Sequence, residues 1–485
     1  MHRTLLMSAL FLIQAFPALA ERPTTGGLFA YALDDVLTYH DDPDGMIRVH
    51  YSMEGPNAVN LSDTDANGIP DYVEMVTDTA LETLELFANT LAVRPPKPET
   101  DFVLSDDGGS AAMDFYLVDF QGNSDGFFGT DACNDTNQCT GHMVVENDFR
   151  GYGYSSAREG LETVVPHELF HAVQAAYNGA LPVWFSEGGA VWAERIFDPD
   201  SRDFFYYANA YLEDTGRSLT NPPAGPVPTF AYSTGLFWHF LSERHDARLM
   251  HELLLGSEGL TTDEAVIESI DATLAQRGDT MVAAWFDFAI ANLGTGARAG
   301  LLDSHPEAAS LSGVRAEAEN RTIDDKERFY PLAATYYRID HIGGPLYQST
   351  DEALQTLIFS LHPVANGAAD GPVEPAVTTW DASQTGPNLL ADDLGAGGYW
   401  VIAANTALHG TSSRVRLCIG TESLSQNCTA VSSHETAHTG VESEPTEAAG
   451  GCQQLGLSPS MILVATMLRF VRRRRTTNPA NQRSR

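Results

Sequence analysis

The sequence predicts an α+β domain followed by an all-β sandwich domain, and three patterns support this prediction. Short strand patterns separated by Gly and Asp loops come first, in "DFVLS", "MDFYLVDF" and "HMVVEND" between residues 101 and 148. Helical patterns follow from Leu161 to about Gly300, and strands followed by helices are the order expected of an α+β domain. Beyond Phe329, β-rich runs such as "TYYRIDHI" and "GGYWVIAANT" recur at the spacing of a sandwich.

The chain is longer than one hydrophobic core supports, because domains typically hold about 50–250 residues. Its 485 residues therefore predict several units in sequence. The expected division is a signal peptide at 1–20, an N-terminal region at 21–100, the α+β domain at 101–325, the sandwich at 326–432, an acidic linker at 433–450 and a C-terminal tail at 451–485.

The N-terminus has the pattern of a secretory signal peptide. Arg3 precedes an apolar run over residues 5–16, and the small residues of "ALA" allow cleavage after Ala20. A buried first helix is the alternative. The signal pattern predicts a secreted protein, located in the extracellular space or at the cell surface.

The other end of the chain combines a cysteine, an apolar run and a basic cluster. Cys452 precedes an apolar stretch over 455–471, and four arginines follow at 472–475. The stretch is shorter than the roughly 20 residues that a membrane helix needs. This order resembles the C-terminal sorting tails of secreted myxobacterial-type proteins. The resemblance implies modification of Cys452 and attachment at the outer surface of a membrane, whereas a plain basic tail is the alternative.

The composition is strongly acidic, with 28 Lys and Arg residues against 65 Asp and Glu residues and a formal net charge of −37. Such a chain repels nucleic acids and anionic lipid surfaces, so the charge argues against both as main partners. Bound cations fit this balance, and so does a solubilising surface without a specific partner.

Five cysteines in a secreted chain predict disulfide pairs and one remainder. Cys133 and Cys139 bracket one polar loop, and Cys418 and Cys428 bracket another. Local disulfides across each loop are the natural assignment, which leaves Cys452 in the tail.

An acidic loop, "DTDANGIPDYVE", matches the pattern of a calcium-binding loop. Calcium takes six to eight oxygen ligands, which a 12-residue loop supplies from positions 1, 3, 5, 7, 9 and 12, with glycine at position 6. Gly68 is at the turn, and the ligand positions hold Asp63, Asp65, Asn67, the Ile69 carbonyl, Asp71 and Glu74. Because no helix precedes the loop, we expect one structural calcium ion that caps the following helix. An Asx-rich turn is the alternative.

The segment "PHELFHAVQAAYNG" holds the strongest chemical pattern in the chain. Pro166 suits the first turn of a helix and Gly179 its end, which predicts a helix over 167–177. His167 and His171 then lie four residues apart on one face, with nitrogens directed at a common point, as a zinc ion requires. Glu168 lies beside them, within reach of a metal-bound water.

A second helix is expected to begin near Glu187, after a loop that contains Pro182. Glu187 and Glu194 share one face of this helix because they are seven residues apart. A catalytic zinc site has three protein ligands and an open fourth position. One glutamate can complete the ligand set while the other orients a ligating histidine.

These two segments resemble a known family. "HELFH" followed by "WFSEGGAVWAER" is similar to the gluzincin metallopeptidases of the aminopeptidase and thermolysin-like type. A wider set of motifs, over about residues 45–200, resembles a group of secreted bacterial metalloproteases. The resemblance implies a zincin-like fold for the α+β domain. It also implies a general base, Glu168, an orienting residue, Glu194, and three zinc ligands, His167, His171 and Glu187.

Two further positions are candidates for contact with a substrate. Glu146 lies in "HMVVENDF", which resembles the edge strand of zincin clefts, where a peptide pairs through its main chain and Glu146 would meet a substrate amine. An ordinary acid at a strand end is the alternative. The preferred phenol for stabilising an oxyanion is Tyr232, with Tyr206, Tyr207 and Tyr211 as competitors.

The principal hypothesis is therefore a secreted or surface-attached zinc-dependent peptidase that acts on a peptide or protein substrate and carries a structural calcium ion. A zinc-bound water would attack the peptide bond, with Glu168 as the base. Aminopeptidase and endopeptidase activity both remain open. The competing hypothesis is a non-catalytic adhesion or binding protein, in which a zincin-like scaffold holds its metals for structure.

Overall fold

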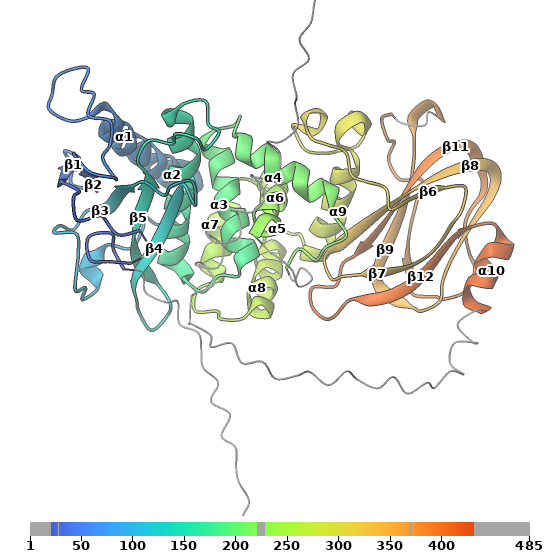
Figure 1. Ribbon diagram of the computed structural model, residues 1–485. Helices are drawn as coiled ribbons and strands as arrows, with labels where there is room; N and C mark the ends of the chain where they lie inside the picture. The colour runs from blue at the N-terminus through green and yellow to red at the C-terminus, as the bar shows by residue number, and fades with distance from the viewer. Residues whose placement is uncertain (1–20, 28, 221–227, 368–370, 431–485) are drawn as a thin grey trace, which may run out of the picture.

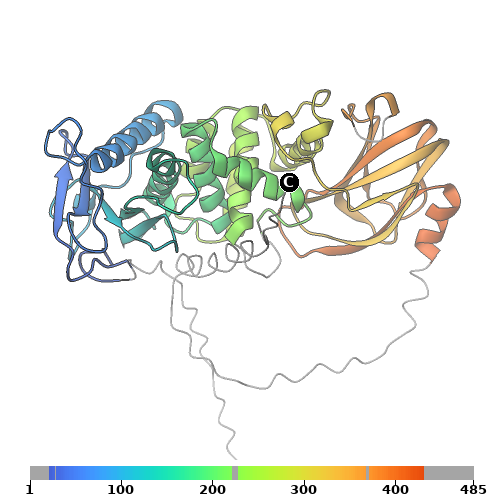
Figure 2. The same cartoon turned by 45° about the horizontal axis from the view of Figure 1, so that its top comes forward.

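The computed structural model of the protein describes residues 21–27, 29–220, 228–367 and 371–430. Its elements form three groups in a row: a mixed sheet with two helices, a group of helices, and a second sheet (Figure 1, Figure 2). The predicted signal peptide, acidic linker and C-terminal tail lie outside the described residues. None of the helices in the described ranges has the length and hydropathy required to span a bilayer.

The first sheet has the strand order β1-β2-β3-β5-β4. β2, β3 and β5 are parallel, while β1 and β4 run antiparallel to their neighbours at the two edges. The bounds are Leu37–Asp41 (β1), Ile47–Ser52 (β2), Met113–Val118 (β3), Gly126–Cys133 (β4) and Cys139–Glu146 (β5). The domain boundary expected at residue 100 therefore falls inside one folded unit, because β2 pairs with β3 across it.

Two helices pack against one face of this sheet. They are α1 (Asp71–Leu86), which continues into the π-helical turn η1 (Phe87–Leu91), and α2 (Ala157–Asn178). Alternation along the strands sends one set of apolar side chains to this face, where Val49, Phe115 and Met143 join Val76 and Leu169 of the helices in one core.

Helix α2 begins ten residues before the expected start at residue 167. Ser156 caps the helix by accepting a hydrogen bond from the Glu159 N–H at 3.1 Å, so the first helical residue is Ala157. Pro166 lies inside the helix, where it has no N–H to donate. Proline is common in the first turn of helices, which is why its position predicted the wrong start.

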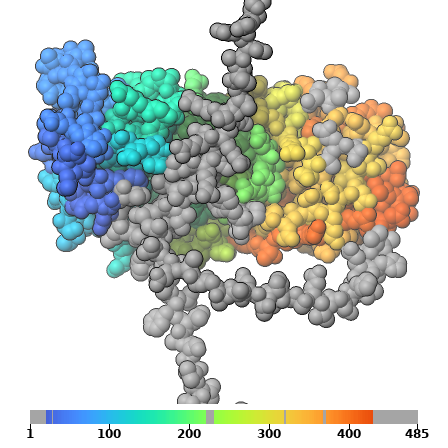
Figure 3. Space-filling model, in the orientation of Figure 1, coloured from blue at the N-terminus to red at the C-terminus, as the bar shows by residue number. Residues whose placement is uncertain are grey.

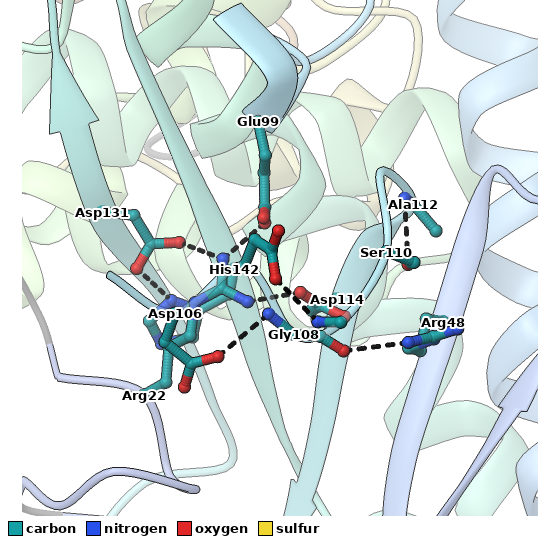
Figure 4. Close-up of polar contacts among 12 residues, drawn as sticks. Arg22, Arg48, Glu99, Asp106, Gly108, Ser110, Ala112, Asp114, Asp131 and His142 are labelled. Atoms are coloured by element: carbon teal, nitrogen blue, oxygen red, sulfur yellow. Dashed lines mark hydrogen bonds and ion pairs between the residues drawn. The ribbon is translucent and has the colours of Figure 1, made fainter. Parts of the chain in front are cut away.

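The opposite face of the first sheet is covered in part by the N-terminal segment. Phe29 packs against the aromatic and aliphatic side chains that β3 and β5 present there. Arg22 is 2% exposed and forms ion pairs with Glu99, Asp114 and Asp131 (Figure 4). These carboxylates come from the short 3-10 helix η2, from β3 and from β4. One buried guanidinium thus ties the N-terminal segment to three parts of the fold.

A group of helices follows the first sheet. Their bounds are Val183–Phe197 (α3), Arg202–Glu213 (α4), Pro228–Ser233 (α5), Gly235–Arg244 (α6), Leu249–Gly256 (α7), Asp263–Gln276 (α8) and Met281–Leu293 (α9). Ser201, Thr262 and Thr280 cap α4, α8 and α9, each accepting from the backbone N–H three residues later. Large buried aromatic side chains dominate the core of this group: Trp192, Phe237, Trp238, Trp285 and Phe288.

The second sheet has the order β10-β9-β11-β8-β12-β7, and β6 pairs with β8. β8 and β11 have 18 residues each. β9 pairs with the end of β11, and β12 pairs with the end of β8. Each long strand therefore contributes to both layers of a sandwich-like sheet. The bounds are Ala318–Asn320 (β6), Ile323–Phe329 (β7), Ala333–Thr350 (β8), Leu354–Pro363 (β9), Thr378–Ala382 (β10), Asn388–Asn405 (β11) and Ser413–Gly420 (β12), with α10 at Glu422–Ala430.

The structure confirms the α+β organisation and the sandwich-like second part. This second part begins before the expected residue 326, because all of β7, from Ile323, pairs with β12. This part packs on the helical group. Tyr336 of β8 donates a hydrogen bond to the Ala289 carbonyl of α9 at 2.8 Å, and the Arg298 guanidinium lies over the Trp400 ring of β11. The space-filling view shows the first sheet and the second sheet at opposite ends of the molecule (Figure 3).

Both predicted disulfides are confirmed. Cys133–Cys139 joins β4 to β5 with an S–S distance of 2.06 Å, and Cys418–Cys428 joins β12 to α10 at 2.08 Å. A Cβ atom at Gly179 would lie 2.5 Å from Cys139 Sγ. Glycine at the end of α2 therefore allows the helix to approach the first disulfide closely.

Candidate functional site

Helices α2 and α3 bring together the two histidines and the glutamate that the sequence singled out. His167 Nε2 and His171 Nε2 lie 3.2 Å apart. Glu187 Oε2 lies 3.5 Å from His167 Nε2 and 3.4 Å from His171 Nε2. The histidines share a face of α2 because they are one turn apart, and Glu187 faces them from the first turns of α3.

This triangle has the dimensions of a metal site. Ligand atoms held about 2.0–2.1 Å from a tetrahedral ion lie about 3.4 Å from one another, close to the three separations here. Glu187 Oε2 is buried and has no hydrogen-bond partner, although it faces two imidazoles. Across the described ranges, no other group of three or more His, Cys, Asp or Glu residues brings ligand atoms within 4.8 Å of one another.

The outer nitrogen of each histidine is held by a hydrogen bond. His167 Nδ1 lies 2.6 Å from Glu194 Oε1, and the other oxygen of this carboxylate accepts from the Ser201 hydroxyl at 3.4 Å. His171 Nδ1 lies 2.8 Å from Gln174 Oε1. Both rings therefore direct Nε2 inwards. The sequence indicated Glu194 for this role but missed Gln174, whose signal is its position three residues after the second histidine.

Burial and charge act on the Glu187 carboxyl in opposite directions. Removal from water opposes ionisation, but His171 and His167 outweigh it and lower the pKa of Glu187 below its ordinary value. The side chain is therefore a carboxylate, the form that binds a metal ion.

Glu168 belongs to α2, and its side chain lies next to the first residue of the edge strand β4. Burial raises the pKa of its carboxyl above the ordinary value, and His167 and His171 partly offset this effect. A Cβ atom at Gly126 would lie 3.2 Å from Glu168 Oε1 and 2.3 Å from Val164 Cγ1. Glycine at the start of β4 thus lets the strand pass close to this carboxyl group.

Tyr232 of α5 lies beside the histidines. Its ring stacks on His167 with a centroid distance of 5.6 Å, and Tyr207 stacks behind it at 5.1 Å. Burial first, and then the nearby Glu187 carboxylate, raises the pKa of Tyr232 well above its ordinary value, so its phenol keeps its proton. Of the competing phenols, Tyr207 lies behind Tyr232, Tyr206 is 62% exposed, and Tyr211 stacks on Phe230.

The structure does not support contact between Glu146 and a substrate. Glu146 is 1% exposed. Its Oε2 accepts hydrogen bonds from the Phe120 N–H at 3.0 Å and the Tyr152 hydroxyl at 2.6 Å, and its Oε1 accepts from the Asn147 N–H at 3.1 Å. Burial raises its pKa to about 7. The carboxyl group is therefore used within the fold, which is the alternative that the sequence left open.

The strand expected to form the edge of the sheet is also corrected. β5, which ends at Glu146, lies between β3 and β4, and the edge belongs to β4. Because β5 pairs directly with β3, β5 lies in the interior of the sheet and β4 forms its edge. Within the described part of the chain, the strand edge next to Glu168 is thus that of β4, which has no partner strand on its outer side.

The acidic loop before α1 gathers most of its predicted ligands around one asparagine. The Asn67 N–H donates to Asp63 and Asp65 at 3.2 Å, and its side-chain amide donates to Asp65 at 3.1 Å and to Glu74 at 2.6 Å. Asp71 instead accepts hydrogen bonds from a threonine within the loop. These hydrogen bonds link Asp63, Asp65 and Glu74 through Asn67, but the three carboxylates do not all bring an oxygen within 4.8 Å of one another, so calcium binding stays a prediction.

Comparison with known proteins gives no family assignment. No family model matches the chain, and no curated protein matches it. Among solved structures, the chain is similar to PliG of Aeromonas hydrophila, a periplasmic inhibitor of g-type lysozyme, at 15% identity and a TM-score of 0.16, over 22% of this chain and 98% of that one. It is also similar to a GH115 4-O-methyl-α-glucuronidase at 11% identity and a TM-score of 0.11, over 65% of this chain and 52% of that one. Neither similarity carries an argument about fold or function.

Proposed function

We propose that the chain is a zinc-dependent peptidase, and that the α+β part has a zincin-like fold. The observation that carries this proposal is the triangle of His167 Nε2, His171 Nε2 and Glu187 Oε2, with sides of 3.2–3.5 Å and a buried oxygen without a hydrogen-bond partner. A glutamate next to the triangle has no use in a purely structural zinc site, which usually fills its fourth position with protein. Glu168 therefore favours catalysis over a structural role.

His167, His171 and Glu187 would hold the ion. When bound, zinc lowers the pKa of a coordinated water and polarises the scissile carbonyl. The Glu168 carboxylate accepts a proton from the attacking water and passes it to the leaving amine. Tyr232 donates a hydrogen bond from its phenol to the carbonyl oxygen as negative charge develops there.

The substrate would lie along β4. The outer edge of this strand has no partner strand among the described residues, and its first residue, Gly126, passes close to Glu168. An extended peptide can add to such an edge through main-chain hydrogen bonds. This position would bring a peptide bond next to the base without any large rearrangement of the sheet.

We further propose a secreted or surface-attached protein with a structural calcium ion in the 63–74 loop. The signal-like N-terminus and the tail support the location. The ligand pattern of the loop and the hydrogen bonds that link Asp63, Asp65 and Glu74 through Asn67 support the calcium ion, which would fix the loop at the start of α1.

The test of the proposed chemistry is Glu168→Gln, compared with Glu162→Gln on an accessible part of α2. We expect Glu168→Gln to lose casein hydrolysis by a factor of about 10²–10⁴, because an amide cannot accept the proton, while zinc content stays at the wild-type level. Glu162→Gln should behave as wild type. Full hydrolysis by Glu168→Gln would contradict the mechanism.

Removal and return of metals separates catalysis from structural metal binding. A chelator removes calcium as well as zinc, so the informative arm is restoration of hydrolysis by zinc in the presence of calcium. A wild-type protein that binds zinc in the His167, His171 and Glu187 site but cleaves neither casein nor a peptide library would support the competing adhesion hypothesis.

A further inference from the structure

A buried glutamine connects the second histidine of the candidate centre to the backbone beside its glutamate. Gln174 lies three residues after His171 on α2 and is 2% exposed. Its Oε1 is 2.8 Å from His171 Nδ1, and its Nε2 donates to the Ser186 carbonyl oxygen at 2.9 Å. Ser186 directly precedes Glu187 in α3. One side chain therefore bridges the two helices that supply all three candidate ligands.

The Ser186 carbonyl determines which way the Gln174 amide faces. A carbonyl oxygen can only accept a hydrogen bond, so the NH2 group of the amide must meet it. The amide oxygen then faces His171, and the Ser186 hydroxyl donates to the same oxygen at 3.1 Å and lies 3.2 Å from His171 Nδ1. Because this oxygen can only accept, the short contact with His171 requires the hydrogen to be on Nδ1.

A hydrogen on Nδ1 leaves the lone pair of the neutral imidazole on Nε2. That atom is the one that lies 3.4 Å from Glu187 Oε2 and 3.2 Å from His167 Nε2. A metal ion in the triangle needs this lone pair. The carbonyl of Ser186 thus selects the tautomer of His171 through the amide of Gln174.

We propose that Gln174 is the positioning residue of this centre, which fixes the His171 tautomer and joins α2 to the start of α3 at the spacing that three ligands require. The inference rests on the proposed zinc site. His167 is oriented by a carboxylate, whereas His171 is oriented by a neutral amide. Since the site already buries several carboxyl groups, an amide orients the second ring without adding another buried charge.

Helix α3 leaves room for this amide. A Cβ atom at Gly189 would lie 2.8 Å from Gln174 Nε2 and 3.3 Å from the Phe170 ring. A methyl group at that position forces the amide or the helix to shift. Gly189→Ala is therefore a second, independent way to disturb the bridge, without any change at Gln174 or at a ligand.

Zinc affinity, measured by competition with a chromophoric chelator, tests the inference. Gln174→Met keeps the volume but removes the hydrogen bonds of the amide with His171 and Ser186, and we expect its zinc affinity to fall about 10–100-fold. Gln174→Glu keeps an acceptor for His171 and loses only the donor to Ser186, so a smaller fall is expected. Gly189→Ala should fall between them. Ser186→Ala removes the hydroxyl contacts with Gln174 and His171 but keeps the carbonyl, so its zinc affinity should fall less than that of Gln174→Met. Glu162→Gln, on an accessible part of α2, is the matched control and should stay close to wild type.

A second readout does not need the metal. The ring nitrogen chemical shifts of His171 in the zinc-free protein at mildly alkaline pH report the tautomer, with the hydrogen on Nδ1 in wild type and a mixture of tautomers in Gln174→Met. Circular dichroism melting establishes that each variant is folded. Unchanged zinc affinity and unchanged shifts in Gln174→Met would overturn the inference. An equal loss of affinity in Ser186→Ala would also overturn it, because the hydroxyl would then be responsible.

These readouts separate the inference from the proposed function. If wild-type protein binds zinc and loses affinity in Gln174→Met but cleaves no peptide, the positioning role stands and the peptidase proposal fails. If wild-type protein binds no zinc, the centre itself is wrong, and the positioning role fails with it.

Discussion

Each histidine of the candidate centre uses one ring nitrogen for a hydrogen bond within the fold and directs the other towards Glu187. Glu187 Oε2 is buried and lies 3.4–3.5 Å from these two inward-facing nitrogens, without a closer hydrogen bond. The donor set of two imidazoles and a carboxylate suits zinc.

Among single residues, Tyr232 provides a prediction that separates catalysis from metal binding. Tyr232→Phe keeps the ring stacked on His167 and removes only the hydroxyl group. Loss of one donor to an oxyanion typically costs about 10²–10³ in kcat. We expect a fall of that size in peptide hydrolysis, with zinc content unchanged. The control is Tyr206→Phe at an exposed position, and wild-type kcat in Tyr232→Phe would assign the oxyanion to another group.

Among the elements, the first sheet depends on a buried ion-pair cluster as well as on its apolar core. Arg22 meets Glu99, Asp114 and Asp131, so one positive charge lies among three carboxyl groups (Figure 4). Buried charges are tolerated only when they are paired, and here the acids outnumber the guanidinium. This imbalance makes the cluster sensitive to pH.

The pKa of Glu99 determines whether the stability of the fold rises or falls with pH. Burial raises its pKa from 4.5 to about 8, against the attraction of Arg22, so the folded state holds a proton that the unfolded chain releases. Stability therefore falls as the pH rises from about 4.5 to about 8. In Glu99→Gln, the loss of unfolding free energy over this pH range should be smaller than in wild type by on the order of 2 kcal/mol, as measured by urea unfolding across a pH series. Glu82→Gln, at an exposed position of α1, is the control, and parallel profiles for Glu99→Gln and wild type would contradict the assignment.

The acidic loop makes a second prediction for a single element. If the loop binds calcium in the folded state only, added calcium should raise the melting temperature, since a ligand at about 100 times its Kd stabilises by about 2.7 kcal/mol. Asp63→Ala should lose this increase because a carboxylate ligand is removed. Asp78→Ala, an exposed acid on α1, should keep it. A calcium effect that persists in Asp63→Ala would place the ion elsewhere.

For the whole molecule, the main question is how the sandwich-like part is held to the helices. Alternate residues of β8 and β11 point to the helical core, so Tyr336 and Trp400 are buried on that side while their neighbours Tyr337 and Val401 are buried inside the second sheet. Both faces are therefore covered at the start of β8 and at the end of β11, which is why residues 399–404 are apolar without a clear period of two.

Trp400 tests this junction. Its side chain is 3% exposed and lies under the Arg298 guanidinium, 4.5 Å from the ring centroid. Trp400→Ala should lower the free energy of unfolding by about 3–5 kcal/mol, as measured by denaturant titration, because a large buried side chain leaves a cavity. Leu389→Ala, at a 48% exposed position of the same strand, is the control. A loss below about 1 kcal/mol would mean that the two parts unfold independently of this contact.

The local parts of the structure were predictable because they depend on residues that are near in sequence. The period of 3.6 residues places His167 and His171 on one face, and the short loops between the paired cysteines favour local disulfides. The β-rich pattern beyond residue 326 likewise predicted the second sheet, although not its start at Ala318. The start of α2 was missed because Pro166 was a weaker guide than the cap at Ser156.

The sequence by itself predicted the candidate metal ligands, the candidate base beside them, the disulfide pairs and the order of strands and helices along the chain. Only the tertiary structure decided which strand forms the edge of the first sheet, that Glu146 is buried in the fold, and that Gln174 meets Ser186. The physical reason is the range of the interactions. Helix periodicity is set within a few residues, whereas the pairing of β3 with β5 and the contact of α2 with α3 depend on how distant segments share one core.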